Sequence, residues 1–142
     1  MSKTRAQLFA LLLLVLCVSG RGSAQQCLSY DPAVERLTGT LLKKTFPGPP
    51  NYESVRKGDR PETFRILHLD SPVCVTGNTD DVNEPERNVT DVQLVLDEGQ
   101  YAEIQRMTGR RIHVVVSGKL FHAHTGHHRT SVLLMVSSIK RG

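Results

Sequence analysis

Alternation of apolar and polar residues predicts five β-strands and one helix. The strand segments are residues 34–46, 63–75, 88–97, 110–123 and 130–139. In the third, Val92 and Leu94 fall on one face, and in the fourth Val114 and Val116 do so. In the second, apolar residues occupy both faces, so the pattern leaves its register open. Gly39 inside the first segment predicts a kink or a bulge.

The predicted helix follows the third strand. Asp97 is a candidate N-cap, and Gln100 three residues later completes a capping box. Tyr101, Ile104 and Met107 or Thr108 then share one helical face, which is typical of core packing. Gly109 is the expected end of the helix.

Two unusual loops separate these elements. Residues 47–62 contain four prolines, which fix the backbone and remove hydrogen-bond donors, so this segment is expected to be a long loop. Residues 121–130 hold four of the six histidines in the chain. The order of elements favours a mainly β fold, a small five-stranded oligomer-binding (OB)-like barrel with one helix between strands three and four. In that fold both loops would meet at one mouth, although another five-stranded topology stays open.

The N-terminus has the pattern of a secretory signal peptide, residues 1–24. A membrane anchor is the rival interpretation, but the apolar run is roughly 11 residues, against the ~20 needed to span a bilayer. Cleavage would leave residues 25–142 as one domain, secreted or periplasmic. That part has 15 basic and 14 acidic residues, a net charge of +1, which does not indicate a nucleic-acid partner.

Two cysteines remain in this domain, Cys27 and Cys74. An oxidising compartment favours a disulfide between them, and two buried free thiols are the alternative.

Three hypotheses explain the histidine-rich segment. The side chains could form a hydrogen-bonded network that stiffens the turn, contact a ligand, or bind zinc or copper through His122, His124 and His127. The spacing permits a metal site without being diagnostic, because no H-E-x-x-H or paired C-x-x-C motif accompanies it. A metal-dependent hydrolase is a weaker possibility. No catalytic residue can be named, because no complete set of nucleophile, base and orienting group is evident.

Several motifs resemble the bacterial domain of unknown function 4431 family. They are "LTGTL", "FPGPPNYESVRKGDRPE", "LDSPVCV", "VQLVL" and "GRRIHVVVSGKLFHAHTGHHRTSVLLMV", and the resemblance is strongest over residues 88–139. It implies a small exported β-rich domain and supplies no catalytic residues.

We therefore predict an exported binding or accessory domain whose partner is an envelope ligand or protein. Aromatic and polar groups at a barrel mouth are typical of such sites. The candidate ligand-binding residues are Tyr52, Arg56, Asp59, His122, His124, His127, His128 and Arg129.

Overall fold

The computed structural model describes residues 27–77, 82–107 and 111–142. The predicted signal peptide therefore lies outside the described residues. The strands are β1 (Leu28–Ser29), β2 (Glu35–Pro47), β3 (Pro61–Thr76), β4 (Glu86–Val95), β5 (Ile112–His122) and β6 (Val132–Arg141). A 3-10 helix, η1, spans Val55–Lys57, and α1 spans Glu98–Arg106.

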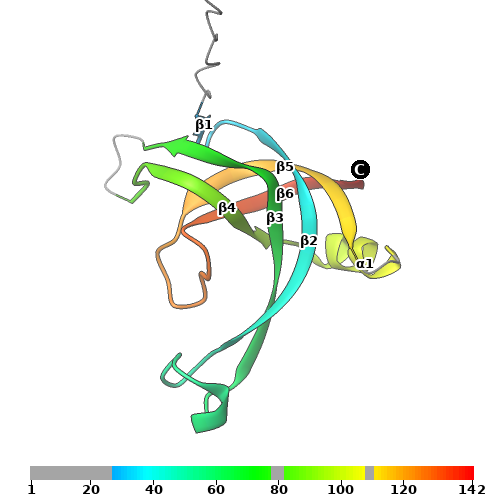
Figure 1. The fold of residues 1–142 in the computed structure, drawn as a ribbon. Helices are drawn as coiled ribbons and strands as arrows, with labels where there is room; N and C mark the ends of the chain where they lie inside the picture. The colour runs from blue at the N-terminus through cyan, green and yellow to red at the C-terminus, as the bar shows by residue number, and fades with distance from the viewer. Residues whose placement is uncertain (1–26, 78–81, 108–110) are drawn as a thin grey trace, which may run out of the picture.

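Strands β2 to β6 form a closed barrel (Figure 1). β2 pairs antiparallel with both β3 and β5, β4 pairs with β3, and β6 pairs with β5. A parallel pairing of β4 with β6 closes the barrel. With α1 between the third and fourth barrel strands, this confirms the predicted five-stranded OB-like barrel.

The extra strand β1 was not predicted. It pairs in parallel with the end of β3. A disulfide joins Cys27, just before β1, to Cys74 in β3, which confirms the predicted pairing. The covalent link holds this two-residue strand, too short to be recognised by periodicity, against the barrel.

Inward-facing apolar residues of all five barrel strands make the core. Its fully buried members include Leu67, Val92, Val114, Val116 and Leu120. Gly39 pairs with Leu69 and Val114 without a shift in register, so the bulge predicted as one alternative at this position is wrong. Glycine is required there because a Cβ atom would collide with the backbone carbonyl of His68 on the neighbouring strand.

The second face of β3 explains why its register was ambiguous. Leu67 and Leu69 point into the barrel, while Ile66 is buried outside the main core cluster. Ile66 pairs with Gln93 of β4, which pairs with Leu133 of β6, so the three form a buried row on the outer surface. Since both faces of β3 are covered here, its apolar residues do not alternate.

The helix begins as predicted, because the Asp97–Gln100 capping box is present. It ends at Arg106, with Met107 as the C-cap, and Gly109 lies outside the described residues. Ile104 packs into the core, but Tyr101 is 38% exposed, so its assignment to the core face was wrong.

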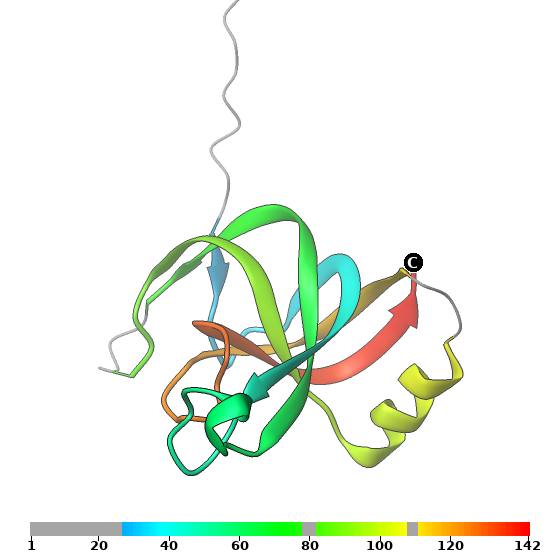
Figure 2. The same cartoon turned by 60° about the horizontal axis from the view of Figure 1, so that its bottom comes forward.

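A long hairpin projects from the barrel (Figures 1 and 2). β2 last pairs with β5 at Leu41, and β3 first pairs with β4 at Ile66, whereas β2 and β3 stay paired from Lys43–Arg65 to Pro47–Pro61. We call residues 43–65 the arm. The predicted loop 47–62 forms the tip of the arm and contains η1.

Candidate functional site

One side chain joins the arm to the loop between β5 and β6 (residues 123–131). The guanidinium of Arg129 lies 5.5, 5.3 and 5.8 Å from the ring centroids of Phe46, Tyr52 and Phe64. It also donates to the carbonyl oxygen of Pro47 at 2.7 Å. The side chain is only 11% exposed, so these contacts are largely shielded from water. Arg129 is therefore the centre of an aromatic cluster contributed mainly by the arm.

Glu62 supplies the counter-charge of this cluster. Its carboxylate lies 3.4 Å from the guanidinium of Arg129 and accepts a hydrogen bond from Nδ1 of His127 at 3.0 Å. The ring of His127 also meets Tyr52 edge-on, with centroids 5.8 Å apart. Two residues of the β5–β6 loop thus share one carboxylate of the arm.

Gln93 holds the same loop against the barrel. Its side-chain amide accepts a hydrogen bond from the backbone N–H of Arg129 at 2.7 Å and donates to the carbonyl of His127 at 3.2 Å. Its own backbone N–H donates to the hydroxyl of Thr130. Gln93 is 5% exposed, so water does not reach its polar groups and these protein partners satisfy them instead. The loop covers the outer surface of β4 in this arrangement.

Asp59 organises the tip of the arm. Its carboxylate accepts hydrogen bonds from the backbone N–H groups of Asn51, Glu53 and Ser54 at 2.8–2.9 Å. The hydrogen bonds from Ser54 and Asn51 hold the pKa of Asp59 below its ordinary value. Asp59 is 4% exposed. Arg56, in η1, is exposed in contrast.

The four histidines of the candidate site make three separate sets of contacts. Nε2 of His122 donates to Glu86 of β4 at 3.0 Å, while His127 bonds Glu62 of the arm. The backbone N–H of His124 donates to Nδ1 of His128, and the two rings meet edge to face with their centroids 4.6 Å apart. Burial, followed by the nearby imidazoles, lowers the pKa of His128, consistent with a neutral ring that accepts this hydrogen bond.

This arrangement does not favour a zinc or copper centre. Within the part of the chain that the structure describes, no group of three His, Cys, Asp or Glu side chains could hold a metal ion. His122, His124 and His127 are instead directed to a glutamate of β4, the backbone and a glutamate of the arm, respectively.

Sequence patterns missed three residues of the site: Phe46, Phe64 and Gln93. The sequence indicated some of these residues and not others. Phe46 and Phe64 lie at strand positions facing away from the core, where an aromatic residue indicates a covered surface. Gln93, between Val92 and Leu94, gave no sign that it would be buried. The side chains of His68 and His113 are 56% and 47% exposed; His68 bonds Asp91 of the adjacent β4, and His113 of β5 bonds Asp70 of β3 across β2.

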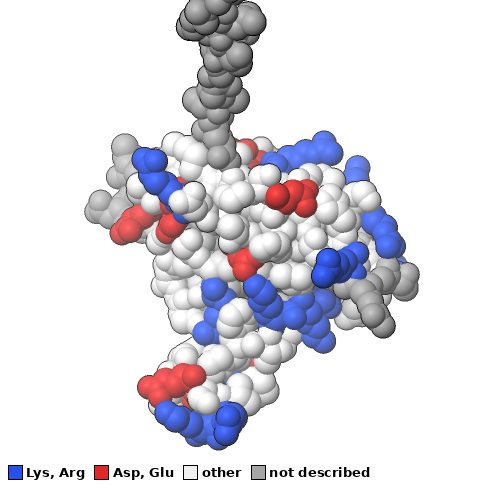
Figure 3. All heavy atoms as spheres, viewed as in Figure 1, with Lys and Arg blue, Asp and Glu red and all other residues white. Residues whose placement is uncertain are grey.

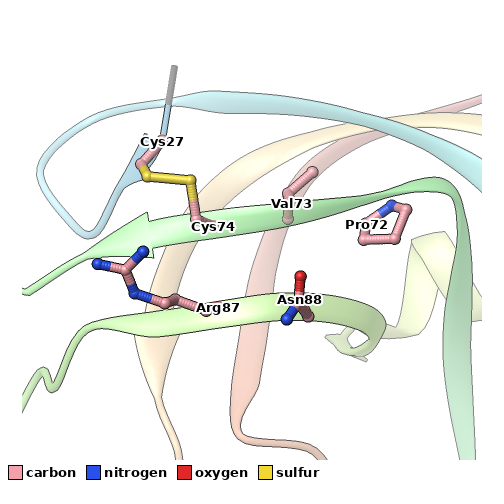
Figure 4. Close-up of a pocket in the computed structure, with 6 residues that line it drawn as sticks. All are labelled: Cys27, Pro72, Val73, Cys74, Arg87 and Asn88. Atoms are coloured by element: carbon pink, nitrogen blue, oxygen red, sulfur yellow. A yellow bond between two sulfur atoms is a disulfide. The ribbon is translucent and has the colours of Figure 1, made fainter. Parts of the chain in front are cut away.

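Two open pockets lie near β4. One, of about 310 Å³, borders the Cys27–Cys74 disulfide and is also lined by Pro72, Val73, Arg87 and Asn88 (Figure 4). The other, of about 280 Å³, lies between residues 87–91 of β4 and residues 129–131 of the β5–β6 loop. The second pocket adjoins the arm–loop cluster and the first does not.

Comparisons with known proteins give one match. Residues 91–140, from β4 to β6, match the family model described as Domain of unknown function (DUF4431), which confirms the predicted resemblance over those residues. No curated protein matches, and no solved structure matches. Among the described residues, no helix is long and apolar enough to cross a membrane.

Proposed function

We propose that this chain, a member of the domain of unknown function 4431 family by its match over residues 91–140, is an exported binding or accessory domain. Its partner, an envelope ligand or protein, is held on the surface formed by the arm and the β5–β6 loop. The signal-like N-terminus and the Cys27–Cys74 disulfide support a secreted or periplasmic location, because disulfides persist in oxidising compartments.

The position of Arg129 carries this proposal. In OB-like barrels, ligands are held by the loops that correspond here to the arm tip and the β5–β6 loop, and by the face of strands two and three. Arg129 ties these two loops together through three aromatic rings and a backbone carbonyl. A surface assembled in advance loses less conformational entropy on binding than two independent loops would.

The candidate residues divide into two roles on this surface. Tyr52, Arg56, His124 and His127 keep exposed or half-exposed side chains and are assigned to ligand contact. The others act through the geometry they impose. These positioning residues are Asp59, His122, His128 and Arg129.

Equilibrium binding to envelope fragments tests the proposal. The probes are a neutral muropeptide and a linear acidic oligosaccharide, titrated against the purified chain and three variants. R56A/H127A removes contact groups, R129M loosens the surface, and R36Q/K140Q changes two exposed cations elsewhere on the barrel. We expect the first two variants to weaken binding about tenfold or more and the third to leave it unchanged. Equal effects of all three, or no binding of either probe, would contradict the proposal.

A further inference from the structure

The arm carries an excess of positive charge. Between residues 43 and 65 there are six basic side chains and three acidic ones. The basic residues are Lys43, Lys44, Arg56, Lys57, Arg60 and Arg65, and the acidic residues are Glu53, Asp59 and Glu62. The predicted domain as a whole is nearly neutral, so this segment concentrates cationic charge.

Two of the three acids are already engaged inside the arm–loop cluster. Asp59 is buried and accepts three backbone hydrogen bonds. Glu62 is shared between Arg129 and His127. Neither carboxylate is therefore directed to the exposed cations of the arm, and the charge that the arm presents to solvent is more positive than its composition suggests.

The arm has two different faces, because side chains alternate along paired strands. Phe46, Phe64 and Glu62 lie on the face that packs against Arg129. The opposite face, which continues the inward-facing side of β2 and β3 beyond the barrel, carries two directly paired rows, Lys43 with Arg65 and Thr45 with Thr63. We call these four residues the outer arm face.

The row of Lys43 and Arg65 is electrostatically unfavourable as it stands. Like charges directly opposite on antiparallel strands repel each other. No ion pair with an acid is found for either residue within the described part of the chain. Lys44, by comparison, is bonded to Asp91 at 2.7 Å on the other face. An anion placed between Lys43 and Arg65 would relieve this repulsion.

The next row supplies neutral hydrogen-bonding groups. The hydroxyls of Thr45 and Thr63 are 2.8 Å apart and both residues are exposed. Each hydroxyl can donate and accept, so the pair can bond a sugar hydroxyl or ring oxygen next to the anion. Farther out, the tip adds Arg56, Lys57 and Arg60, all exposed.

The cationic side chains and the threonine hydroxyls follow the length of the arm and do not surround a single point. Figure 3 shows Lys and Arg atoms over the lower part of the barrel and again, beside Asp or Glu atoms, at the tip of the arm. Pro47 lies four residue steps along the strand from Lys43, about 13 Å at the usual rise per residue, and the tip lies beyond. A single small anion cannot contact both ends, whereas a linear polymer can.

We propose that the outer arm face and the arm tip bind a linear acidic polysaccharide. Its anionic groups pair with Lys43 and Arg65 and with the tip cations, and its hydroxyls bond the threonine pair. The inference rests on the proposed function, for which it names the class of partner, and it extends the binding surface from the arm tip, which both share, onto the face of the arm opposite Arg129. A flat anionic lipid surface fits less well, because contact with the tip would leave the Lys43–Arg65 row away from the charge.

Binding of heparin-derived oligosaccharides of graded length tests this inference with the full purified chain. We expect affinity to rise with length until the oligosaccharide spans both ends of the arm, and inorganic sulfate to compete weakly. K43Q/R65Q and R56Q/K57Q should each weaken binding about tenfold at low salt. Each lost contact should lower the slope of log K against log salt by roughly 0.7–0.9, if counterion release follows the nucleic-acid case.

The matched control is R36Q/K140Q, which removes the same total charge from exposed positions outside the arm. Removal of the Lys43–Arg65 repulsion should leave the melting temperature unchanged or slightly higher, so loss of binding by K43Q/R65Q cannot be attributed to misfolding. T45V/T63V should weaken oligosaccharide binding about threefold and leave binding of inorganic polyphosphate unchanged, because only the sugar uses the hydroxyls.

Three outcomes would overturn the inference. Equal loss in the control would indicate unspecific attraction. Binding to vesicles of anionic phospholipid that depends on the tip and is indifferent to K43Q/R65Q would indicate membrane docking instead. If the oligosaccharides do not bind but the neutral muropeptide does, and R129M weakens it, the proposed function stands and the acidic partner is wrong.

Discussion

Replacement of Arg129 with methionine tests whether this residue holds the arm and the β5–β6 loop together. Methionine keeps much of the side-chain length and apolar contact but removes the charge and the donors. Three desolvated ring contacts together contribute on the order of 2 kcal/mol, and a charged hydrogen bond to the carbonyl of Pro47 about 1.5 kcal/mol. With some packing regained, we expect a net loss of about 3 kcal/mol.

This loss should appear locally, because the cluster lies outside the barrel core. Hydrogen exchange measures such local opening. A change of about 3 kcal/mol corresponds to a roughly 100-fold increase in the opening equilibrium. We therefore expect the amides of residues 48–60 and 123–131 to exchange about two orders of magnitude faster in R129M, while protected amides of β5 change little. R129K, which keeps the charge but not the planar fork, should give an intermediate increase of about tenfold.

Two results would show that Arg129 does not have this local role. Exchange within about threefold of the parent protein in both segments would mean that Arg129 does not hold them. An equal acceleration throughout the barrel would mean that Arg129 supports the whole fold. R36M, a change of the same type at an exposed position of β2, should leave both segments unaffected.

Three further predictions concern Gln93, the Cys27–Cys74 disulfide and His128. Q93L leaves the two backbone partners of the side-chain amide buried without a hydrogen bond, so the free energy of unfolding should fall by about 2–3 kcal/mol in calorimetry. An unchanged free energy of unfolding would mean that Gln93 does not hold the loop against the barrel. C27S/C74S removes a disulfide between residues 47 positions apart, and in the chain-entropy model this lowers the free energy of unfolding by about 4 kcal/mol. Denaturant unfolding measures this loss, and a value below about 1 kcal/mol would show that β1 is held by its other contacts. The lowered pKa of His128 means that its neutral form contributes stability above pH 6.5 that is lost as pH falls through the folded-state pKa. The opening equilibrium at the His124 amide, obtained from exchange rates corrected for their intrinsic pH dependence, should therefore rise with acidification. H128N, which keeps an acceptor without titrating, should abolish this rise; an identical profile in H128N would assign it to another group.

Local patterns in the sequence predicted most of the barrel. The barrel strands show an inward apolar face at every second residue, and the Asp97–Gln100 capping box depends only on neighbouring residues. Ile66 breaks the alternation in β3, because it is buried on the outer surface beside Gln93, to which the β5–β6 loop is bonded. Periodicity reports that a face is apolar and does not report what covers it.

The candidate site was predictable in place but not in construction. The OB-like order of elements brought the proline-rich and histidine-rich segments together, and the observed contact of Tyr52 with His127 agrees with this. The aromatic cluster around Arg129 could not be predicted, because it joins residues 65 or more positions apart in the chain. Asp59 looked like a ligand contact, whereas its short distance to three amides makes it a support for the arm tip.

The most direct test of a shared binding surface is a map of backbone amide chemical shifts during titration with a heparin-derived oligosaccharide. We expect the perturbed amides to fall within residues 43–65 and 123–131, the arm and the β5–β6 loop. Perturbations centred instead on the pocket beside the Cys27–Cys74 disulfide, with the arm unaffected, would contradict it.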